Sequence, residues 1–420
     1  MKLLVIGSGG REHAIAKKLL EDSKVAEVYC AKGNPGMEKD GIQLVEIAED
    51  DHQALIAFAK DYGINWTFVG PEIPLLNGIV DDFQAAGLKI FGPQKAAAMI
   101  EGSKDFAKQL MVQNKIPTAD YQTFTDFAQA KRYVEQKGAP IVIKADGLAA
   151  GKGVVVALTI AEALQALSEM LEDNKFGASG AQVVIEEFLA GEEFSLLAFV
   201  REAEVYPMVI AQDHKRAFDG DRGPNTGGMG AYSPVPQIAD DLVTQAVEQV
   251  LKPAAAGMIA NGTPFTGILY AGLIATKTGV KVIEFNARFG DPETQVVLAR
   301  LQSSLAEIID DLLKGRQPTI VWNEKASVGV VVAADGYPGV YQKGMLLPTI
   351  TNRSTNVFYA GVSGSKERLI ASGGRVFLVE ASGDSLKEAQ EQVYQELSNH
   401  SLDNFFYRRD IGSKALKELK

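Results

Sequence analysis

Short apolar runs alternate with helix-like segments through the first hundred residues. The apolar runs occupy 2–7, 25–31, 66–69 and 89–91. Between them, segments 11–21 and 50–63 carry apolar residues at helical spacing. This alternation predicts βαβ units and therefore a parallel sheet, in which ligands bind beyond the carboxyl ends of the strands. Four glycine- and proline-rich stretches fall at those ends: 7–10, 33–36, 70–72 and 92–93.

The rest of the chain mixes helices with strands of another kind. Segments 139–158 and 181–200 each have the pattern of two antiparallel strands joined by a loop. Helical patterns occur at 103–114, 292–315 and 384–398, and C-terminal strand patterns at 327–334 and 374–381. The stretch 315–325 has the composition of a linker. These patterns predict a mixed α/β (α+β) protein of several domains.

Composition narrows the class of protein. With 420 residues, roughly two to four domains are expected, and the hydrophobic and charged fractions of 46% and 23% are ordinary for a globular protein. No apolar run is long enough to span a membrane, and the N-terminus predicts a first strand rather than a secretory signal. A single cysteine, Cys30, rules out an internal disulfide and fits a cytoplasmic location.

The net charge of −11 argues against a general nucleic-acid-binding protein. An anionic substrate would be repelled by the overall field of such a chain. Locally gathered lysine, arginine and backbone N–H groups would therefore have to bind it.

The stretch VIEFNARFGDPET, residues 282–294, ends an apolar strand in polar side chains. Glu284, Asn286 and Arg288 share one face if the chain stays extended, since side chains alternate along a strand. An acid, an amide oxygen and a cation make a poor core face but a suitable site for a metal ion carrying a polyphosphate. The alternative is an ordinary solvated strand end.

Two glycine loops resemble nucleotide-binding motifs without matching them. In GSGGREH, residues 7–13, the dinucleotide fingerprint fails because Glu12 replaces its third glycine. What remains is a helix N-terminus with Arg11, which could hold a single phosphate or be a plain turn.

In DGLAAGKGVVV, residues 146–156, Gly147 and Gly151 are too close for a P-loop, and Gly153 replaces the serine or threonine. A glycine-rich flap that closes over phosphates is the interpretation we favour there.

Charged residues near these loops have both functional and ordinary interpretations. Lys144 ends an apolar strand and Lys104 lies near a helix start, and each could equally be a surface lysine. A strand could leave its sheet near Glu186, Glu187 and Glu193. Its backbone could bind a base while an acid binds ribose hydroxyls. The alternative is the charged end of a hairpin. Residues 211–234 form a long polar stretch that suits anion binding or disorder.

The order of these features is more informative than any one of them. Two lysines (Lys104, then Lys144), a glycine flap, the strand exit EEFL…GEE and a terminal EFNARFGDPE together resemble the ATP-grasp carboxylate–amine ligases. A narrower resemblance is carried by KADGLAAGKGV, DHKRAFDGDRGPNTGGMGAYSP and EFNARFGDPETQ, together with GSGGREHA, GNPG and FVGPE. Within that superfamily they are similar to the glycinamide ribonucleotide synthetase family, also called phosphoribosylamine–glycine ligases. The resemblance runs over essentially the whole chain and departs at no motif position.

The resemblance implies an ATP-grasp architecture with a Rossmann-like start. We expect an N-terminal substrate domain at 1–100 and a lid subdomain with the flap at 121–189. The ATP-grasp core would comprise 101–120 and 190–322, and a C-terminal domain would cover 325–420.

The resemblance also implies a reaction: ATP, glycine and 5-phosphoribosylamine give ADP, phosphate and glycinamide ribonucleotide, the second step of purine synthesis. Magnesium or manganese would assist, and the protein would be a cytoplasmic monomer or weak homo-oligomer without nucleic-acid or membrane partners. Another ATP-grasp ligase, a nicotinamide oxidoreductase and a non-catalytic nucleotide-binding module are the alternatives.

Site residues follow from the resemblance position by position. Glu284 and Asn286 would bind the metal, and Lys144, Arg288 and Asp213 would be catalytic. The expected ATP-binding residues are Lys104, Lys144, Gly151, Gly153, Glu186, Glu187, Leu189 and Glu193. The expected substrate-binding residues are Gly9, Gly10, Arg11, Glu12, Asn34, Pro71, Glu72, Asp213, Lys215, Arg288 and Gly290.

Overall fold

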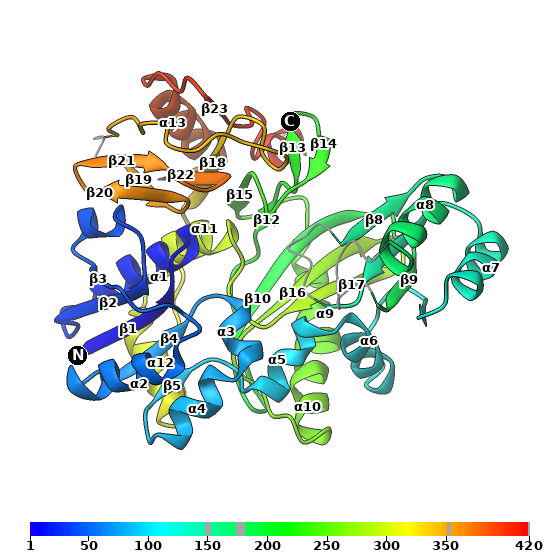
Figure 1. Cartoon of the computed structure of the whole chain (residues 1–420), viewed down its shortest axis with the longest axis horizontal. Coiled ribbons are helices and arrows are strands. Elements are labelled where there is room, and N and C mark those ends of the chain that lie inside the picture. The colour runs from blue at the N-terminus through cyan, green and yellow to red at the C-terminus, as the bar shows by residue number, and fades with distance from the viewer. Residues whose placement is uncertain (148–152, 174–180, 351–353, 419–420) are drawn as a thin grey trace.

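The computed structural model describes residues 1–147, 153–173, 181–350 and 354–418, which form four larger β-sheets with helices packed around them (Figure 1). No helix in these residues is both long enough and apolar enough to cross a membrane.

The N-terminal sheet is parallel, with strand order β3–β2–β1–β4–β5. Its strands are β1 (Lys2–Gly7), β2 (Glu27–Lys32), β3 (Gln43–Val45), β4 (Trp66–Val69) and β5 (Ile90–Phe91). Helices α1 (Gly10–Leu20), α2 (His52–Asp61), α3 (Glu72–Asn77) and α4 (Ile79–Ala85) connect them. This confirms the βαβ arrangement that the apolar periodicity predicts.

The central sheet is antiparallel, in the order β11–β10–β16–β17. It consists of β10 (Glu192–Arg201), β11 (Glu204–Pro207), β16 (Thr266–Thr276) and β17 (Gly279–Asn286). Helices α5 (Lys95–Gly102), α6 (Lys104–Gln113), α9 (Asp240–Ala246) and α10 (Lys252–Ala260) accompany it, and α11 (Glu293–Arg300) and α12 (Leu305–Leu313) follow β17. The polar residues 284 and 286 thus end an edge strand of this sheet.

A smaller antiparallel sheet, β6–β9–β7–β8, projects at the side of the molecule with helices α7 (Phe127–Lys137) and α8 (Ile160–Leu171) (Figure 1). Its strands are β6 (Tyr121–Phe124), β7 (Ile141–Ala145), β8 (Val154–Ala157) and β9 (Val183–Glu187). The expected β7–β8 hairpin is confirmed. The expected pairing within 181–200 is wrong, because β9 pairs with β6 and β7 whereas β10 belongs to the central sheet. The link at 188–191 therefore carries the chain from one sheet to another.

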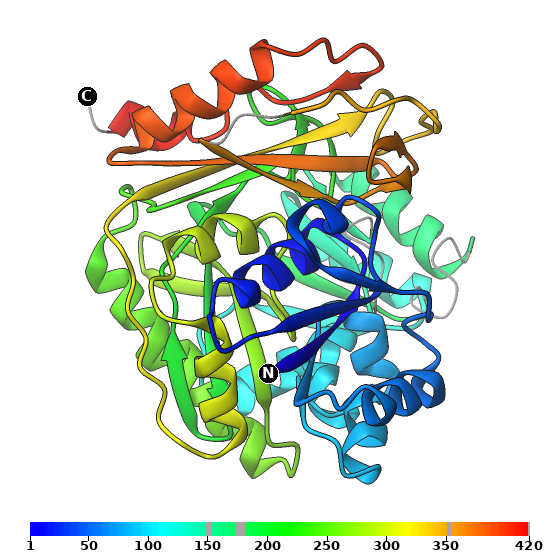
Figure 2. The same cartoon turned by 90° about the vertical axis from the view of Figure 1, so that its left-hand side faces the viewer.

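The C-terminal sheet recruits strands from the middle of the chain. Its order is β12–β15–β18–β22–β19, with β23 (Phe405–Phe406) also paired to β18. The strands are β12 (Gln212–Asp213), β15 (Gly230–Ser233), β18 (Ala326–Ala334), β19 (Thr355–Tyr359) and β22 (Arg375–Gly383), and α13 (Leu386–Ser398) covers them (Figure 2). Residues 211–234 are therefore ordered, since β12, β15 and the hairpin β13 (Arg216–Phe218)–β14 (Arg222–Asn225) all lie within them.

The N-terminal and central sheets share one apolar core. Phe289, which follows the end of β17, is fully buried between Phe68 of β4 and Phe199 of β10, with ring centroids 6.0 and 6.3 Å away. The same cluster includes apolar residues of α11 and α12. Packing of one aromatic ring thus fixes the end of β17 relative to the N-terminal sheet.

We predict that Phe289→Ala lowers the free energy of unfolding by about 3–5 kcal/mol, because it leaves a cavity where the two sheets meet. Urea denaturation would measure this change. Val340→Ala is the control, since Val340 is 98% exposed. Equal denaturation midpoints for the two variants would contradict the shared core.

Candidate active site

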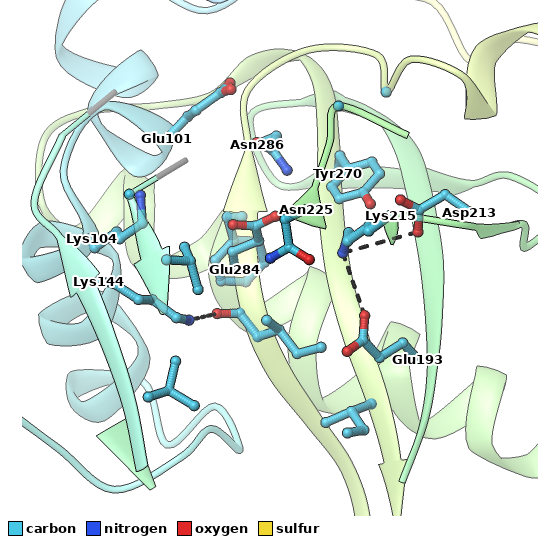
Figure 3. Close-up of a pocket in the computed structure, with 18 of the residues that line it drawn as sticks. Glu101, Lys104, Lys144, Glu193, Asp213, Lys215, Asn225, Tyr270, Glu284 and Asn286 are labelled. Atoms are coloured by element: carbon cyan, nitrogen blue, oxygen red, sulfur yellow. Dashed lines mark hydrogen bonds and ion pairs between the residues drawn. The ribbon is translucent and has the colours of Figure 1, made fainter. Parts of the chain in front are cut away.

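A cavity of about 820 Å³ opens where the small sheet, the central sheet and the C-terminal sheet face one another. Its lining includes residues of α5, α6, β7, β9, β10, β12 and β17, together with Arg375 and Lys414 from the C-terminal part of the chain. Figure 3 shows side chains from several of these elements pointing into one space. The chain thus gathers polar groups from widely separated segments around it.

The polar end of β17 lies on the cavity wall. Glu284 and Asn286 both line it, as the period of the strand predicts (Figure 3). Burial raises the pKa of the Glu284 carboxyl, but the charges of Lys215, Lys104, Lys144 and Arg288 outweigh burial, and the net shift is downward. Glu284 is therefore ionised at neutral pH.

This pair of oxygen donors fits a hard divalent cation. A carboxylate and an amide oxygen are magnesium ligands, and magnesium commonly takes few protein ligands and fills its remaining positions with water and phosphate oxygens. Within the described residues no group of three or more His, Cys, Asp or Glu side chains could hold a metal. A metal bound at Glu284 and Asn286 would consequently depend on a substrate for its other ligands.

Two of the predicted phosphate-binding lysines enter from the other side of the cavity. Lys144 is the penultimate residue of β7, and its Nζ donates to the Ile283 carbonyl at 2.9 Å. Lys104 begins α6, with its Nζ 3.4 Å from the Gly147 carbonyl. Both line the cavity (Figure 3). Gly153 lines it as well, whereas Gly151 lies outside the described residues.

Glu186 has a different environment from the one expected. Its carboxylate is buried and forms ion pairs with Lys144, at 2.9 Å, and with Lys108, at 3.1 Å. The acid is therefore paired with two ammonium groups, a contact that the sequence did not predict. Glu187 pairs with Lys281 at 3.4 Å, and Leu189 lines the cavity.

Asp213 and Lys215 form a partly exposed charged pair on the opposite wall. The Lys215 Nζ lies 4.0 Å from Asp213 and 3.5 Å from Glu193 (Figure 3). The carboxylates of Asp213 and Glu193 raise the pKa of Lys215 well above its usual value. Burial raises the pKa of Asp213 to about 7 in spite of the lysine. Asp213 can therefore exchange a proton near neutral pH.

Two carboxylates neutralise the charge of Arg288, whereas the sequence predicted no acidic partner for it. Its guanidinium lies 3.2 Å from Glu72 and 2.7 Å from Glu101. The other oxygen of Glu101 accepts from the Ala287 N–H at 2.7 Å. Glu101 was missed because it sits in an alanine-rich helix without any motif around it. Arg11 lies nearby, bonded to the Phe289 carbonyl at 2.9 Å.

Glu12, which replaces the third glycine of the dinucleotide fingerprint, has its side chain in the turn between β1 and α1. Its carboxylate accepts from the Gly9 N–H at 2.7 Å and from Arg11 at 2.6 Å. A Cβ on Gly7, whose φ is +126°, would lie 2.5 Å from the Glu12 side chain, and one on Gly70 would lie 2.2 Å from it. A carboxylate thus fills the space at this turn and accepts the hydrogen bond of the Gly9 N–H, although Gly9 was expected to bind substrate.

The remaining predicted substrate residues divide into two groups. Arg11, Glu72, Arg288 and Gly290 line the cavity, whereas Gly9, Gly10, Glu12, Asn34 and Pro71 are not part of its lining. The Asn34 amide donates to the carbonyls of Ser8, at 2.8 Å, and Tyr359, at 2.9 Å. In this structure Asn34 joins the N-terminal domain to β19.

Two further lining residues, Arg375 and Glu293, were not among the expected site residues. Arg375, at the start of β22, donates to the carbonyls of Gly227 and Asp291 at 2.9 and 2.7 Å. Glu293 accepts from Ser195 at 3.1 Å and from Tyr270 at 2.9 Å, in a buried cluster. Only the pairing of distant strands brings Arg375 to the cavity, so no local pattern could reveal it, whereas Glu293 lies within the EFNARFGDPETQ motif and could have been found there.

Comparison with known proteins identifies the architecture. Models of the phosphoribosylglycinamide synthetase N domain, ATP-grasp (A) domain and C domain match residues 1–101, 102–294 and 327–414. A phosphoribosylamine–glycine ligase of Streptococcus pyogenes serotype M3 is 57% identical over 421 residues, covering both chains completely. One of Streptococcus pneumoniae serotype 4 is 57% identical over 99% of this chain and the whole of that protein.

Solved structures agree with this assignment. A phosphoribosylamine–glycine ligase of Thermotoga maritima has a TM-score of 0.86 and 31% identity, covering 98% of this chain and 100% of that one. The biotin carboxylase domain of Hydrogenobacter thermophilus 2-oxoglutarate carboxylase, in complex with MgADP, has a TM-score of 0.74 at 15% identity, over 97% of this chain and 91% of that one. The second likeness concerns the fold alone. The family resemblance expected from the motifs is thus confirmed, and the chain belongs to the phosphoribosylglycinamide synthetase family.

Proposed function

We propose that this chain uses ATP to join glycine to 5-phosphoribosylamine, giving glycinamide ribonucleotide, ADP and phosphate, the second step of purine synthesis. The observation that carries the proposal is the cavity in which the β17 oxygens Glu284 and Asn286 meet three lysines from separate elements. The names of full-length relatives supply the substrates.

The chemistry explains why such a cavity is needed. The glycine carboxylate is a poor electrophile because its leaving group would be oxide. Phosphorylation by ATP gives glycyl phosphate, from which phosphate leaves when the amine of phosphoribosylamine attacks. The first step brings two anions together, and two unit charges 4 Å apart repel by about 4 kcal/mol at an effective dielectric near 20. Cations must offset that repulsion.

The residues on the cavity wall can be given roles in this reaction. Lys104 and Lys144 would bind phosphates of ATP, and backbone groups between Glu186 and Leu189 would bind adenine. Glu193 would take ribose hydroxyls. Glu284 and Asn286 would hold magnesium or manganese, which supplies charge neutralisation on the phosphate oxygens. The 2-oxoglutarate carboxylase domain that shares this fold was solved with MgADP.

Phosphoribosylamine would occupy the end of the cavity nearest the N-terminal sheet, where Arg11, Glu72 and Arg288 lie. Glycine would lie near Asp213 and Lys215. The small sheet at 121–189 would act as a lid, and its flap would exclude water from the acyl phosphate, which hydrolyses readily. Most of the flap, residues 148–152, lies outside the described residues.

The attacking amine must lose a proton after it bonds to the carbonyl carbon. Asp213 is suited to accept it, since its pKa is about 7 and it faces the cavity. Lys215 would attract the glycine carboxylate before its phosphorylation and the departing phosphate in the second step. These roles assign chemistry to both Asp213 and Lys215.

We also propose that the protein works in the cytoplasm as a monomer or weak homo-oligomer, without nucleic-acid partners. Its one cysteine, Cys30, is buried and free, which fits a reducing compartment. The overall negative charge makes nucleic acid an unfavourable partner.

A coupled assay for ADP, omitting each substrate in turn, tests the function. We expect ADP release only when ATP, glycine, phosphoribosylamine and a divalent cation are all present. Release that requires bicarbonate instead of glycine would indicate another ATP-grasp ligase. No ATP consumption with the complete mixture would leave a nucleotide-binding module as the better description.

We predict that Glu284→Gln lowers the rate of ADP formation at least about 100-fold, because it removes the one charged metal ligand, and raises the metal concentration needed for half-maximal rate. Thermal unfolding would report whether the fold persists. Glu135→Gln, on the exposed side of α7, is the matched control and should leave the rate unchanged. Normal turnover in Glu284→Gln would remove this residue from the mechanism.

We predict that the rate of ligation rises with pH through about 7, since Asp213 must be ionised to accept the amine proton. Below that value the rate should fall about tenfold per pH unit. Asp213→Asn should lose most of the activity together with this limb of the pH–rate profile. An unchanged profile in Asp213→Asn would show that another group takes the proton.

A further inference from the structure

Lys108 is a buried lysine that none of the roles above uses. It lies one helical turn after Lys104 on α6, and its side chain is 2% exposed. Its Nζ donates to the Thr118 hydroxyl at 2.8 Å and lies 3.1 Å from the Glu186 carboxylate. Burial of an ammonium group is costly, so a lysine is stable in this place only with such partners.

Glu186 consequently has two cationic partners, one on each oxygen. Lys108 pairs with one oxygen and Lys144 with the other, and all three side chains are between 2% and 4% exposed. One carboxylate needs only one ammonium group for neutrality. The cluster therefore carries an excess positive charge at the cavity wall, which is an arrangement that suits an anion.

The two lysines differ in how they are held. The Thr118 hydroxyl that accepts from Lys108 donates in turn to the Val282 carbonyl at 2.8 Å, so a chain of hydrogen bonds ties Lys108 to β17. Its other side lies beside the Tyr121 ring, 5.5 Å from the centroid. Lys144 is bonded to β17 directly, since its Nζ donates to the Ile283 carbonyl at 2.9 Å, and it is close enough to Glu284 to lower the pKa of that carboxyl. Both lysines are thus held to β17, Lys108 through Thr118 and Lys144 directly, and Lys144 is the one that acts on Glu284.

We propose that Lys108 is a positioning residue for Lys144: by keeping the Glu186 carboxylate paired, it allows Lys144 to give its charge to the phosphates of ATP. Without Lys108, any movement of Lys144 toward a phosphate would leave a buried carboxylate without a counter-ion, which is strongly unfavourable. Lys144 would then stay with Glu186. This inference rests on the proposed function, since it takes the phosphates to be those of ATP.

A double-mutant cycle separates this role from direct contact with the nucleotide. The four proteins are the wild type, K108M, E186Q and K108M/E186Q, each tested for ATP affinity by calorimetry and for KM and kcat by ADP release. K108M should weaken ATP binding and raise the KM for ATP at least about tenfold, with the KM for glycine unchanged. In the E186Q background the same substitution should change ATP affinity less than about threefold, because no carboxylate is left unpaired.

An equal loss of ATP affinity in both backgrounds would overturn the proposal, since Lys108 would then act on the nucleotide directly. If K108M alone does not fold, the comparison of E186Q with K108M/E186Q still tests the proposal. A loss of ATP affinity above tenfold between those two proteins would also overturn it. The matched control is the exposed pair Lys131–Glu135 on α7, for which the corresponding cycle should show no coupling. Calorimetry measures ATP binding without turnover. If the wild type binds ATP but does not join glycine to phosphoribosylamine, the proposed function is contradicted, and the role of Lys108 in ATP binding can still be tested.

Discussion

The site depends on one electrostatic constraint: a carboxylate at the end of an edge strand must stay ionised inside a cavity. Glu284 meets this condition because Lys104, Lys144 and Lys215 approach it from α6, β7 and the segment after β12. Those lysines in turn need fixed positions, which the small sheet, the central sheet and the C-terminal sheet supply. The arrangement of the sheets is therefore the means by which an anionic protein assembles a local cluster of cations.

The distribution of charge within the cavity is uneven. At the N-terminal end Arg288 is held between Glu72 and Glu101, and Arg11 contacts Glu12, so these cations are largely neutralised by acids. At the other end two lysines share Glu186, which leaves net positive charge. The polyphosphate is expected at the lysine-rich end, and a sugar with hydroxyl groups is better matched to the carboxylates of the arginine-rich end.

The sequence predicted features whose cause is local. Apolar periodicity was sufficient for the parallel N-terminal sheet, and period-two alternation placed Glu284 and Asn286 on one wall. Features that depend on distant pairings were missed: the switch from β9 to β10 between sheets, the recruitment of β12 and β15 by the C-terminal sheet, and the entry of Arg375. No local pattern encodes which strand a segment will pair with. Nor does one show that the Glu12 carboxylate will accept the hydrogen bond of the Gly9 N–H.

The position of the metal tests the central claim most directly. Crystals grown with manganese and a non-hydrolysable ATP analogue, measured at the manganese absorption edge, would locate the ion by its anomalous scattering. The account predicts a peak within about 2.0–2.6 Å of oxygens of Glu284 and Asn286 and of the analogue's phosphates. A peak bound to other side chains, with Glu284 and Asn286 remote from it, would contradict the account.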